Sequence, residues 1–263
     1  MTLTIATWNV NSVRLRLDGL ARLAAEKAPD VLCLQEIKVR DELFPADAIA
    51  AMGYPHQVVA GQKGYHGVAI CSRLPLADGQ RREWWGNKDS RHVHAVLPGG
   101  IELHNFYVPA GGDEPDPAIN EKFAHKLGFL EEITAWFAAR DRDKLILVGD
   151  LNIAPLESDV WSHKALLKVV SHTPVEVAAL ERLAASRDWV DAVRHFIPPS
   201  EKLYSWWSYR AADWSAVDKG RRLDHVWVTP DLAGALAGAE VLRDARGWPK
   251  PSDHAPVLVR LSP

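Results

Sequence analysis

The stretch 145-LILVGDLN-152 gives the strongest indication of the fold, because an apolar run ends directly in Gly149, Asp150 and Asn152. Four consecutive large aliphatic residues followed by glycine are typical of a strand that is buried on both faces. Asp150 and Asn152 stand two positions apart, so in extended chain their side chains point the same way. The stretch therefore predicts a buried strand that brings two polar side chains to one edge of a sheet.

Similar short apolar runs recur along the whole chain. We expect strands at 3–7, 31–35, 67–71, 92–96, 102–107, 145–148, 223–228 and 257–261. The spacing of apolar residues predicts helices at 16–27, 45–52, 118–139 and 175–186, and mostly helix and loop over 151–204. This mixture favours two packed sheets with helices outside, in a single domain over residues 1–263.

The composition is that of a globular protein and excludes several classes. Of the 263 residues, 47% are hydrophobic and 25% are charged, which excludes disorder as the main state. We find no apolar run near the roughly 20 residues that a membrane helix needs. The net charge of −3 gives no support for nucleic acid binding by bulk charge, but an acidic metal site can offset a local basic face.

The two cysteines, Cys33 and Cys71, are too few for a disulfide framework and both lie in apolar runs. We expect buried free thiols in a reducing compartment. The N-terminus has no basic region and no cleavage site typical of a signal peptide. We therefore expect a cytoplasmic protein, associated with the nucleoid if bacterial, and a monomer.

Polar residues cluster at the ends of the predicted strands. They are Asn9, Asn11, Gln35, Glu36, Tyr107, Asp150, Asn152, Asp224, Asp253 and His254. If the two late strands near Asp224 and His254 run antiparallel to the others, all of these side chains lie at one rim. A set dominated by hard oxygen ligands suits Mg²⁺, or Mn²⁺ as a substitute, rather than zinc.

The chemistry of this rim can be assigned from the residue types. Mg²⁺ commonly binds through one or two carboxylates plus a substrate phosphate, so Glu36 and Asp253 would be enough. Asp253 can face the metal while His254 faces the substrate.

A second group of rim residues would handle the proton. Asp224 could hold one nitrogen of His254, and Asp150 could orient and deprotonate water. The Asn152 amide could donate to an oxyanion. Together these parts describe metal-assisted attack of water on a phosphodiester.

Each feature also has an ordinary structural interpretation. Gly149-Asp150 can be a plain turn, Asp224 a salt-bridged strand end, His254 a cap and Asn9 a turn residue. His92 and His94 have no third ligand nearby in the sequence, so we interpret them as a surface pair. The segment 61-GQKG-64 lacks the spacing of a P-loop, and we interpret it as a turn with Lys63 available to a phosphate.

Eight motifs follow one another along nearly the whole chain. They are WNVN at 8–11, LQEIKV at 34–39, GQKGYHGVA at 61–69, NFYVP at 105–109, GDLNIAP at 149–155, SWWSYR at 205–210, RLD at 222–224 and PSDHAPV at 251–257. In this order they resemble the exonuclease III family of Mg²⁺-dependent DNA repair nucleases, within the endonuclease/exonuclease/phosphatase superfamily. The resemblance implies a four-layer α/β sandwich of two mixed β-sheets flanked by helices.

The resemblance also implies roles for individual residues. Glu36 would be the main metal ligand, helped by Asp253, Asn9, Asn11, Asp150 and Asn152. Asp150 would activate water, Asn152 and His254 would stabilise the transition state, Asp224 would orient His254, and Tyr107 would contact the scissile phosphate or assist proton transfer. Trp206 and Trp207 would form part of a pocket for an abasic sugar or pack against the opened duplex.

Basic residues beside the motifs are candidates for phosphate contacts. They are Arg14, Arg16, Lys38, Lys63, Arg91, Arg221, Arg222 and Lys250, with Asn11 as a further DNA contact. The implied partner is double-stranded DNA, cleaved 5′ to abasic sites or shortened from 3′ ends.

One departure from the family pattern concerns substrate preference. Members often carry Gln where this chain has Ala110, which puts the balance between exonuclease and abasic-site activity in question. The segment 162–177 is the least family-like, and we note His163, Lys164, Lys168 and His172 as candidate DNA contacts beside the plainer interpretation of an exposed helix or loop.

Two other functions remain open at this point. The same scaffold could serve a phosphodiesterase or phosphatase that acts on RNA, an inositol phosphate or a lipid head group. It could also be a DNA-binding module without activity, although Glu36, Asp150, Asp224, Asp253 and His254 are all present.

Overall fold

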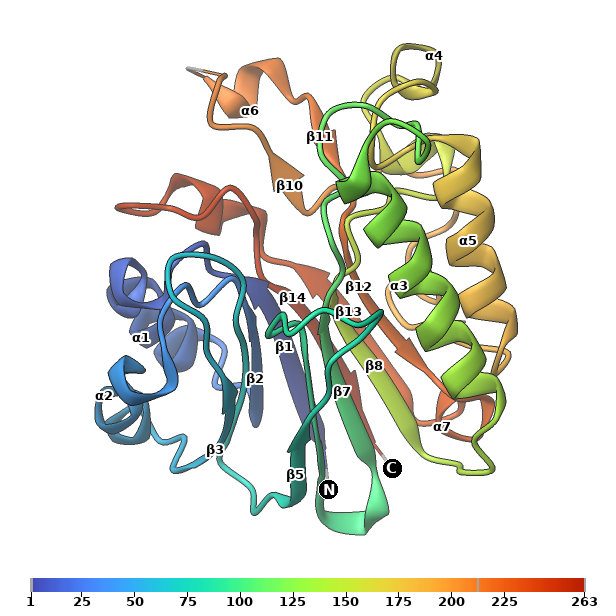
Figure 1. The fold of residues 1–263 in the computed structure, drawn as a ribbon. Helices are drawn as coiled ribbons and strands as arrows, with labels where there is room; N and C mark the ends of the chain where they lie inside the picture. The colour runs from blue at the N-terminus through green and yellow to red at the C-terminus, as the bar shows by residue number, and fades with distance from the viewer. Residues whose placement is uncertain (1, 212, 263) are drawn as a thin grey trace.

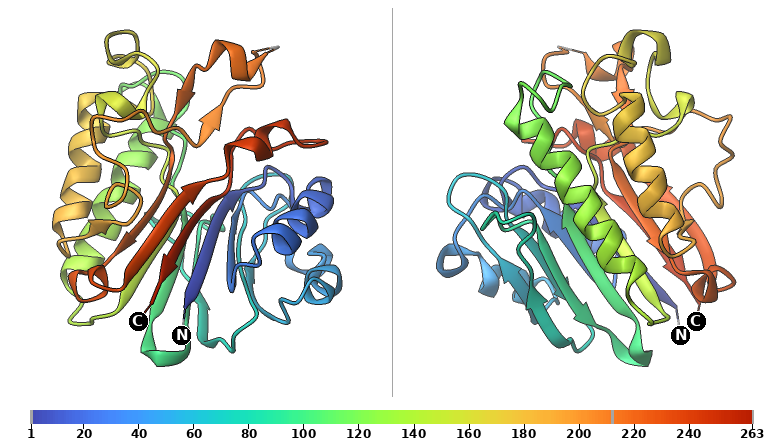
Figure 2. Two further views of the ribbon diagram at one scale, coloured as in Figure 1. Left: turned by 180° about the vertical axis from the view of Figure 1, so that it is seen from behind. Right: turned by 45° about the vertical axis from the view of Figure 1, so that its right-hand side comes forward.

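The chain folds into two six-stranded sheets that pack face to face, with helices on both outer sides (Figures 1 and 2). The computed structural model describes residues 2–211 and 213–262, so the ends of the predicted domain and position 212 lie outside the described residues. The first sheet has the order β13-β14-β1-β2-β4-β3 and the second β5-β6-β7-β8-β12-β9. The predicted four-layer α/β sandwich is therefore confirmed.

The elements have the following bounds. The first sheet contains β1 (Leu3–Asn9), β2 (Val31–Gln35), β3 (His56–Ala60), β4 (Val68–Ser72), β13 (Leu236–Val241) and β14 (Val257–Leu261). The second contains β5 (Ala77–Arg81), β6 (His92–Val96), β7 (Glu102–Tyr107), β8 (Leu145–Asp150), β9 (Val190–Asp191) and β12 (Asp224–Val228). The helices are α1 (Leu17–Glu26), α2 (Ala46–Ala51), α3 (Glu121–Ala138), α4 (His163–Leu166), α5 (Pro174–Ala185), α6 (Trp214–Val217) and α7 (Pro230–Ala233), and β10 (Trp206–Trp207) pairs with β11 (Gly220–Arg221).

Alternating side chains of the central strands enter two different cores, which explains why these strands are apolar throughout. Ile5 of β1 faces the core between the sheets, together with Val148 of β8. Trp8, three residues further along β1, packs on the opposite side of the sheet among residues of α1 such as Leu20. The outer face of the second sheet is covered by α3 and α5 (Figure 1).

The strands that the sequence did not predict lie at or near the sheet edges. β5 is exposed along its whole length, and β3 and β13 are only partly buried. A strand that buries little apolar surface carries no strong hydrophobic alternation, so pattern alone could not reveal it. In the described ranges 2–211 and 213–262, helices long and apolar enough to cross a membrane are absent.

The direction of the strands brings the polar motifs to one rim. β1 and β2 are parallel, as are β7 and β8, whereas β12 runs antiparallel to β8 and β14 antiparallel to β1. The carboxyl ends of β1, β2, β7 and β8 therefore meet the amino ends of β12 and β14, as the placement of the motifs required.

Candidate active site

The strand register places the two central acids of the rim side by side. Asp150, the last residue of β8, stands opposite Asp224, the first residue of β12. On its other side, Asp150 pairs with Tyr107 at the end of β7. Three polar side chains from distant parts of the sequence thus share one end of the second sheet.

Gly149 is required at its position because the backbone of β7 approaches closely. Its φ is +137°, and a β-carbon there would lie 1.9 Å from the carbonyl oxygen of Phe106. Only glycine fits this contact and this conformation. The glycine thus allows β8 to stay paired with β7 right up to Asp150.

Three of the predicted site residues, Asn11, Glu36 and Asn152, adopt an unfavourable backbone conformation. Glu36 has φ 50° and Asn152 has φ 54°, both in the left-handed region. Non-glycine residues there cost free energy, and such strain concentrates at functional sites. The fold holds these side chains where unconstrained chain would not place them.

His254 lies between two carboxylates. Its Nδ1 is 2.8 Å from Asp224 Oδ2, and its Nε2 is 3.7 Å from Asp150 Oδ2. Ser205 Oγ donates to the same oxygen of Asp224 at 2.6 Å, which fixes that carboxylate. In this geometry the Asp224 carboxylate holds the Nδ1 side of the His254 imidazole.

The electrostatics of these buried groups are coupled. Burial alone would lower the pKa of His254, but Asp224 and Asp150 outweigh it and raise the pKa to about 10. Burial raises the pKa of Asp150 to about 7, although His254 partly opposes the shift. A protonated imidazole beside a carboxylate that can take up a proton near neutral pH is suited to acid–base work on a phosphoester.

Asn9 links the acids of the two sheets as a hydrogen-bond donor. Its Nδ2 donates at 2.9 Å both to Glu36 Oε1 and to Asp150 Oδ2. Its oxygen accepts the backbone N–H of Asn11, which fixes the orientation of the amide. The amide nitrogen faces the acids, so the proposed use of Asn9 as an oxygen ligand for a metal does not fit this arrangement.

Glu36 has donors on both carboxylate oxygens. Tyr107 Oη donates to Oε1 at 2.9 Å, and the Lys38 ammonium lies 2.7 Å from Oε2. Burial would raise the pKa of Glu36, but Lys38 and the Asn9 amide outweigh it and the pKa is lowered. Burial and the nearby Glu36 and Asp150 raise the pKa of Tyr107, so its hydroxyl keeps its proton.

Asp253 faces the same space from the other edge of the site. Its Oδ1 accepts from Asn11 Nδ2 at 3.1 Å, and its Oδ2 accepts from Trp206 Nε1 at 2.9 Å. The Asn11 oxygen accepts from Lys38 at 2.6 Å, so Lys38 already places a cation among these oxygens. A set of carboxylate and amide oxygens that holds an ammonium group could also hold a metal cation.

A cavity of about 600 Å³ opens over this cluster. Glu36, Tyr107, Asp150, Asn152, Asp253 and His254 line one part of it. Trp161, Trp206, Lys219 and Arg221 also line it. Lys219 lies 4.5 Å from the Trp161 ring centre and Arg221 lies 5.3 Å from that of Trp206. The cavity is thus lined by cations as well as by the acid–imidazole cluster.

The predicted DNA contacts divide into three groups. Trp206 and Arg221 line the cavity, and Asn11 contacts Asp253 beside it. Lys63 is exposed in the loop between β3 and β4. Trp207 is only 2% exposed and its indole donates to Asp218, so the structure does not offer it to DNA.

The arginines Arg91 and Arg222 are also buried, contrary to their expected place in a phosphate footprint. Arg91 is 6% exposed, pairs with Asp89 and lies 5.0 Å from the ring centre of Tyr107. Arg222 is 1% exposed and pairs with Asp191. Arg91 thus packs against the site residue Tyr107, whereas Arg222 binds acids outside the site, and a count of positive charges cannot distinguish either role from DNA contact.

The unusual segment 162–177 borders the cavity through its middle residues rather than through its histidines. Val169, Val170 and Ser171 line the cavity. His172 is buried and bonds His163 and the Ala154 carbonyl, which leaves it a structural role. Lys164 and Lys168 are exposed, so the DNA contacts suggested for them stay predictions.

Some cavity residues had no signal in the sequence. Trp161 and Lys219 stand outside the motifs and reach the wall only through tertiary packing. Ser205, which donates to Asp224, is the first residue of the SWW motif, so its place in a motif was the signal that could have found it. Ala110 lines the cavity with a methyl group, at the position where members of the family that the motifs resemble often carry the amide of Gln.

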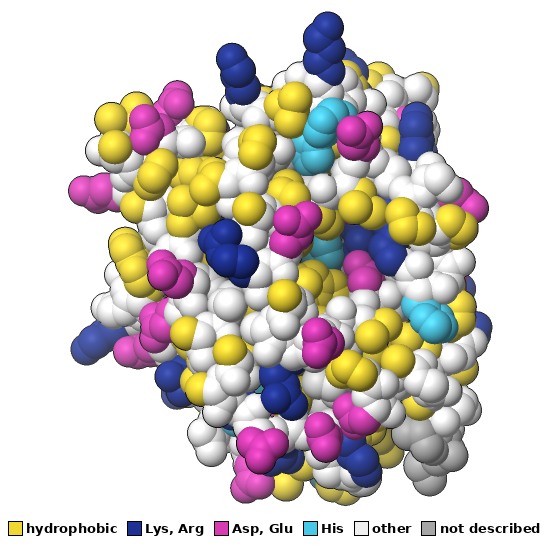
Figure 3. Space-filling model, turned by 90° about the vertical axis from the view of Figure 1, so that its right-hand side faces the viewer, with side chains coloured by type: hydrophobic (Ala, Val, Ile, Leu, Met, Phe, Trp, Pro, Cys, Tyr) yellow, Lys and Arg dark blue, Asp and Glu magenta, His cyan; other side chains and the backbone are white. Residues whose placement is uncertain are grey.

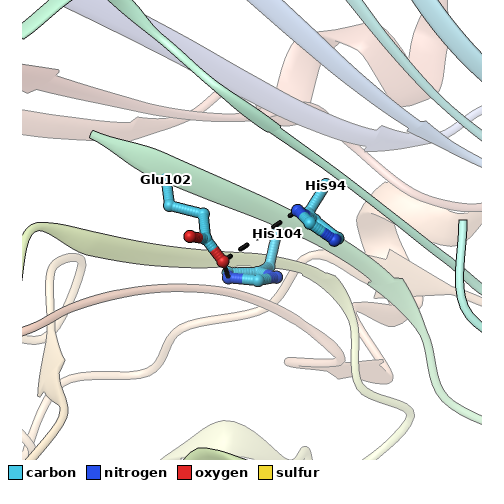
Figure 4. Close-up of side chains that lie close together, drawn as sticks. All are labelled: His94, Glu102 and His104. Atoms are coloured by element: carbon cyan, nitrogen blue, oxygen red, sulfur yellow. Dashed lines mark ion pairs between the residues drawn. The ribbon is translucent and has the colours of Figure 1, made fainter. Parts of the chain in front are cut away.

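A second group of possible metal ligands lies under α3, away from the rim. His94, Glu102 and His104 place one ligand atom each within 4.8 Å of one another (Figure 4). His92 is fully buried beside them, so the interpretation of His92 and His94 as a surface pair was wrong. The missing third ligand comes from β7, which pairs with β6.

Hydrogen bonding indicates a structural network there rather than a metal site. Trp84 Nε1 can only donate, so His92 Nδ1 accepts and its Nε2 donates to His104 Nδ1. His104 Nε2 then carries its hydrogen toward Glu102 Oε1, 2.9 Å away. The carboxylate also pairs with Arg140 and Arg142, whose charges oppose a further cation.

This network predicts a pH-dependent loss of stability. Burial lowers the pKa of His104 to about 4, against about 6.5 in the unfolded chain. The unfolded state therefore takes up a proton first, and stability falls as pH drops from 6.5 toward 4. Between pH 6.5 and 5, the free energy of unfolding of His104→Gln should fall by about 2 kcal/mol less than that of wild type, as measured by chemical unfolding. His195→Gln at an exposed site is the control, and equal losses in wild type and His104→Gln would contradict the assignment.

The molecular surface over α3 and α5 gives no strong electrostatic preference. On this face Lys and Arg alternate with Asp and Glu (Figure 3). The arrangement agrees with the small net charge of −3.

Comparison with known proteins shows which family and which solved structures the chain is similar to. Residues 6–254 match the profile of the Endonuclease/Exonuclease/phosphatase family. The exodeoxyribonuclease III of Haemophilus influenzae is 31% identical, over 95% of this chain and 97% of that protein. An AP endonuclease from Archaeoglobus fulgidus has a TM-score of 0.91 at 32% identity, with 98% of each chain covered. The 3′ phosphatase NExo from Neisseria, solved with a product DNA hairpin, has a TM-score of 0.91 at 32% identity, over 98% of this chain and 99% of that chain.

Proposed function

Because the chain belongs to the endonuclease/exonuclease/phosphatase family, we propose that it is a Mg²⁺-dependent DNA repair nuclease. We propose that it hydrolyses the phosphodiester 5′ to abasic sites and removes nucleotides or blocking groups from 3′ ends of duplex DNA. The resemblance to exonuclease III is confirmed by the similarity to the Haemophilus enzyme. The observation that carries the proposal is Asp150 beside the Asp224–His254 pair, at the floor of a cavity with a cationic wall.

In this proposal the chain's own residues move the proton and hold the phosphate. Asp150 accepts a proton from the attacking water, because its raised pKa of about 7 suits a base near neutrality. Protonated His254, held by Asp224, donates to a phosphoryl oxygen as negative charge develops.

Two further donors would complete the phosphate site. Tyr107 keeps its proton, and its single O–H, which here donates to Glu36, would have to turn to donate to the phosphate or the leaving group. Asn152 uses one N–H on the Val108 carbonyl at 2.8 Å and has a second to offer. Glu36 and Asp253 would hold Mg²⁺, which when bound supplies positive charge against the phosphate oxygens.

The wall of the cavity supports a nucleic acid substrate. Arg221 donates to the Val170 carbonyl and to Ser171 Oγ, so its guanidinium is fixed above Trp206. Trp206 offers a flat apolar surface for an exposed sugar or a terminal nucleotide. We further propose that residues 1–263 act as one catalytic domain and a monomer, since both halves of the chain share the core between the sheets.

The test uses two labelled duplexes, one with a single abasic-site analogue and one undamaged with a recessed 3′ end. We expect Mg²⁺-dependent incision at the lesion and shortening of the recessed end, and loss of both in EDTA. The ratio of the two rates measures the effect of Ala110. A folded protein that cuts neither duplex would contradict the proposal and favour RNA or a small phosphoester, to be screened next.

A further inference from the structure

A fully buried ion pair lies directly behind the cavity. Lys126 of α3 and Glu176 of α5 are both 0% exposed, and the Lys126 ammonium contacts Glu176 Oε1. Burying two charges is costly unless every donor and acceptor is used. Since well-packed apolar side chains could join two helices at lower cost, the contacts of this pair are informative.

The Lys126 ammonium uses its three N–H groups on three different segments. Besides Glu176, it donates to the backbone carbonyl of Asn152 at 2.8 Å and to that of Ala110 at 3.2 Å. Asn152 and Ala110 both line the cavity. Asn152 has a positive φ of 54°, so its carbonyl is held in a conformation that free chain disfavours.

Glu176 extends the same network to Ser171 and Arg221, which also line the cavity. Its carboxylate accepts the backbone N–H of Ser171 at 2.9 Å and the Thr173 hydroxyl at 2.6 Å. Ser171 also has a positive φ, 89°, and its hydroxyl accepts from Arg221 at 2.8 Å. A continuous chain of hydrogen bonds thus joins Asn152, through Lys126 and Glu176, to Arg221.

We infer that Lys126 and Glu176 are a positioning pair, which sets the distance between the Asn152 side of the site and the Arg221 wall. Neither residue touches the cavity in this role; each holds a strained backbone segment from behind. The inference rests on the proposed function for its kinetic consequences, but its structural consequence can be measured without activity.

The pair should act on the rate more than on binding. Small displacements of a catalytic group can reduce turnover by one to two orders of magnitude. We expect Lys126→Met/Glu176→Gln, which removes both charges together, to lower kcat on duplex DNA by at least about tenfold. The dissociation constant for DNA in EDTA should change less than about threefold, since phosphate contacts at the surface remain.

A matched control is Glu102→Gln, which breaks a buried ion-pair network under the same helix but away from the cavity. It should lower the melting temperature and leave kcat within about twofold of wild type, because the site geometry is unaffected. If the double variant loses stability but keeps kcat within about twofold of wild type, as the control does, the pair is merely structural and the inference is wrong.

Two further measurements keep the inference testable. Thr173→Val removes one hydrogen bond to Glu176 with little change in shape, and should lower kcat by a few fold. This variant serves as the test if the double variant does not fold. Hydrogen exchange of peptides over residues 150–154 and 169–173 should be faster in the variants, while peptides around His254 stay unchanged. Unchanged exchange together with unchanged kcat would overturn the inference; a wild type that cuts no DNA, but whose exchange responds as expected, would contradict only the proposed function.

Discussion

Asp150→Asn is expected to lower turnover on duplex DNA by about 10³–10⁴-fold, while the affinity for DNA stays within about threefold of wild type. The carboxylate accepts hydrogen bonds from Asn9 Nδ2 and from the backbone N–H of Asn152. An amide can keep only one of these and loses the basicity that the reaction needs. Its position at the end of β8 is otherwise unchanged.

The two effects are measured separately. Single-turnover incision of the abasic duplex gives the rate, and fluorescence anisotropy in EDTA gives the affinity. The double variant Lys126→Met/Glu176→Gln should show a smaller loss, since it displaces the site without removing the base. If Asp150→Asn weakens binding as much as it slows cleavage, Asp150 serves the structure of the rim and the acid–base assignment is wrong.

Glu36→Gln is expected to raise the Mg²⁺ concentration for half-maximal activity by about 10–100-fold. The amide oxygen can still accept from Asn9 and Tyr107, so the loop keeps its hydrogen bonds. What is lost is the negative charge that Mg²⁺ requires. Activity should return in part at high Mg²⁺, because Asp253 remains.

The measurement is the rate on the recessed duplex as Mg²⁺ is titrated, with Glu42→Gln as the control for loss of one exposed carboxylate. A metal dependence equal to that of wild type would remove Glu36 from the ligand set. Glu36 also pairs with Lys38, so the thermal stability of the metal-free variant is recorded to separate loss of metal from loss of this ion pair.

The candidate site was largely accessible from the sequence because its residues stand at strand ends. The motifs around Glu36, Asp150 and His254 each follow or precede an apolar run, and the directions of the strands bring these motifs to one rim. The failures have physical causes. Trp207 and Arg91 carry the side chains expected of DNA contacts, but burial depends on packing that no short motif encodes.

The supports behind the site were harder to find. Lys126 lies on the buried stripe of α3, between Phe123 and Leu130 at helical spacing, and a charge on such a stripe is a signal. The sequence could not say which acid would pair with it, because Glu176 is 50 residues away. His92 was misjudged for the same reason: its partners arrive from β7 and from Trp84.

The sequence by itself determined the class of fold, the family and the acids of the rim, because hydrophobic periodicity and motif order are local properties. Only the tertiary structure decided how these groups work together. The register of β8 with β12 sets Asp150 beside Asp224, and the hydrogen bond from Asn11 turns the Asn9 amide toward the acids. Protonation and orientation depend on neighbours that are distant in the chain, so they are defined only when the two sheets pack together.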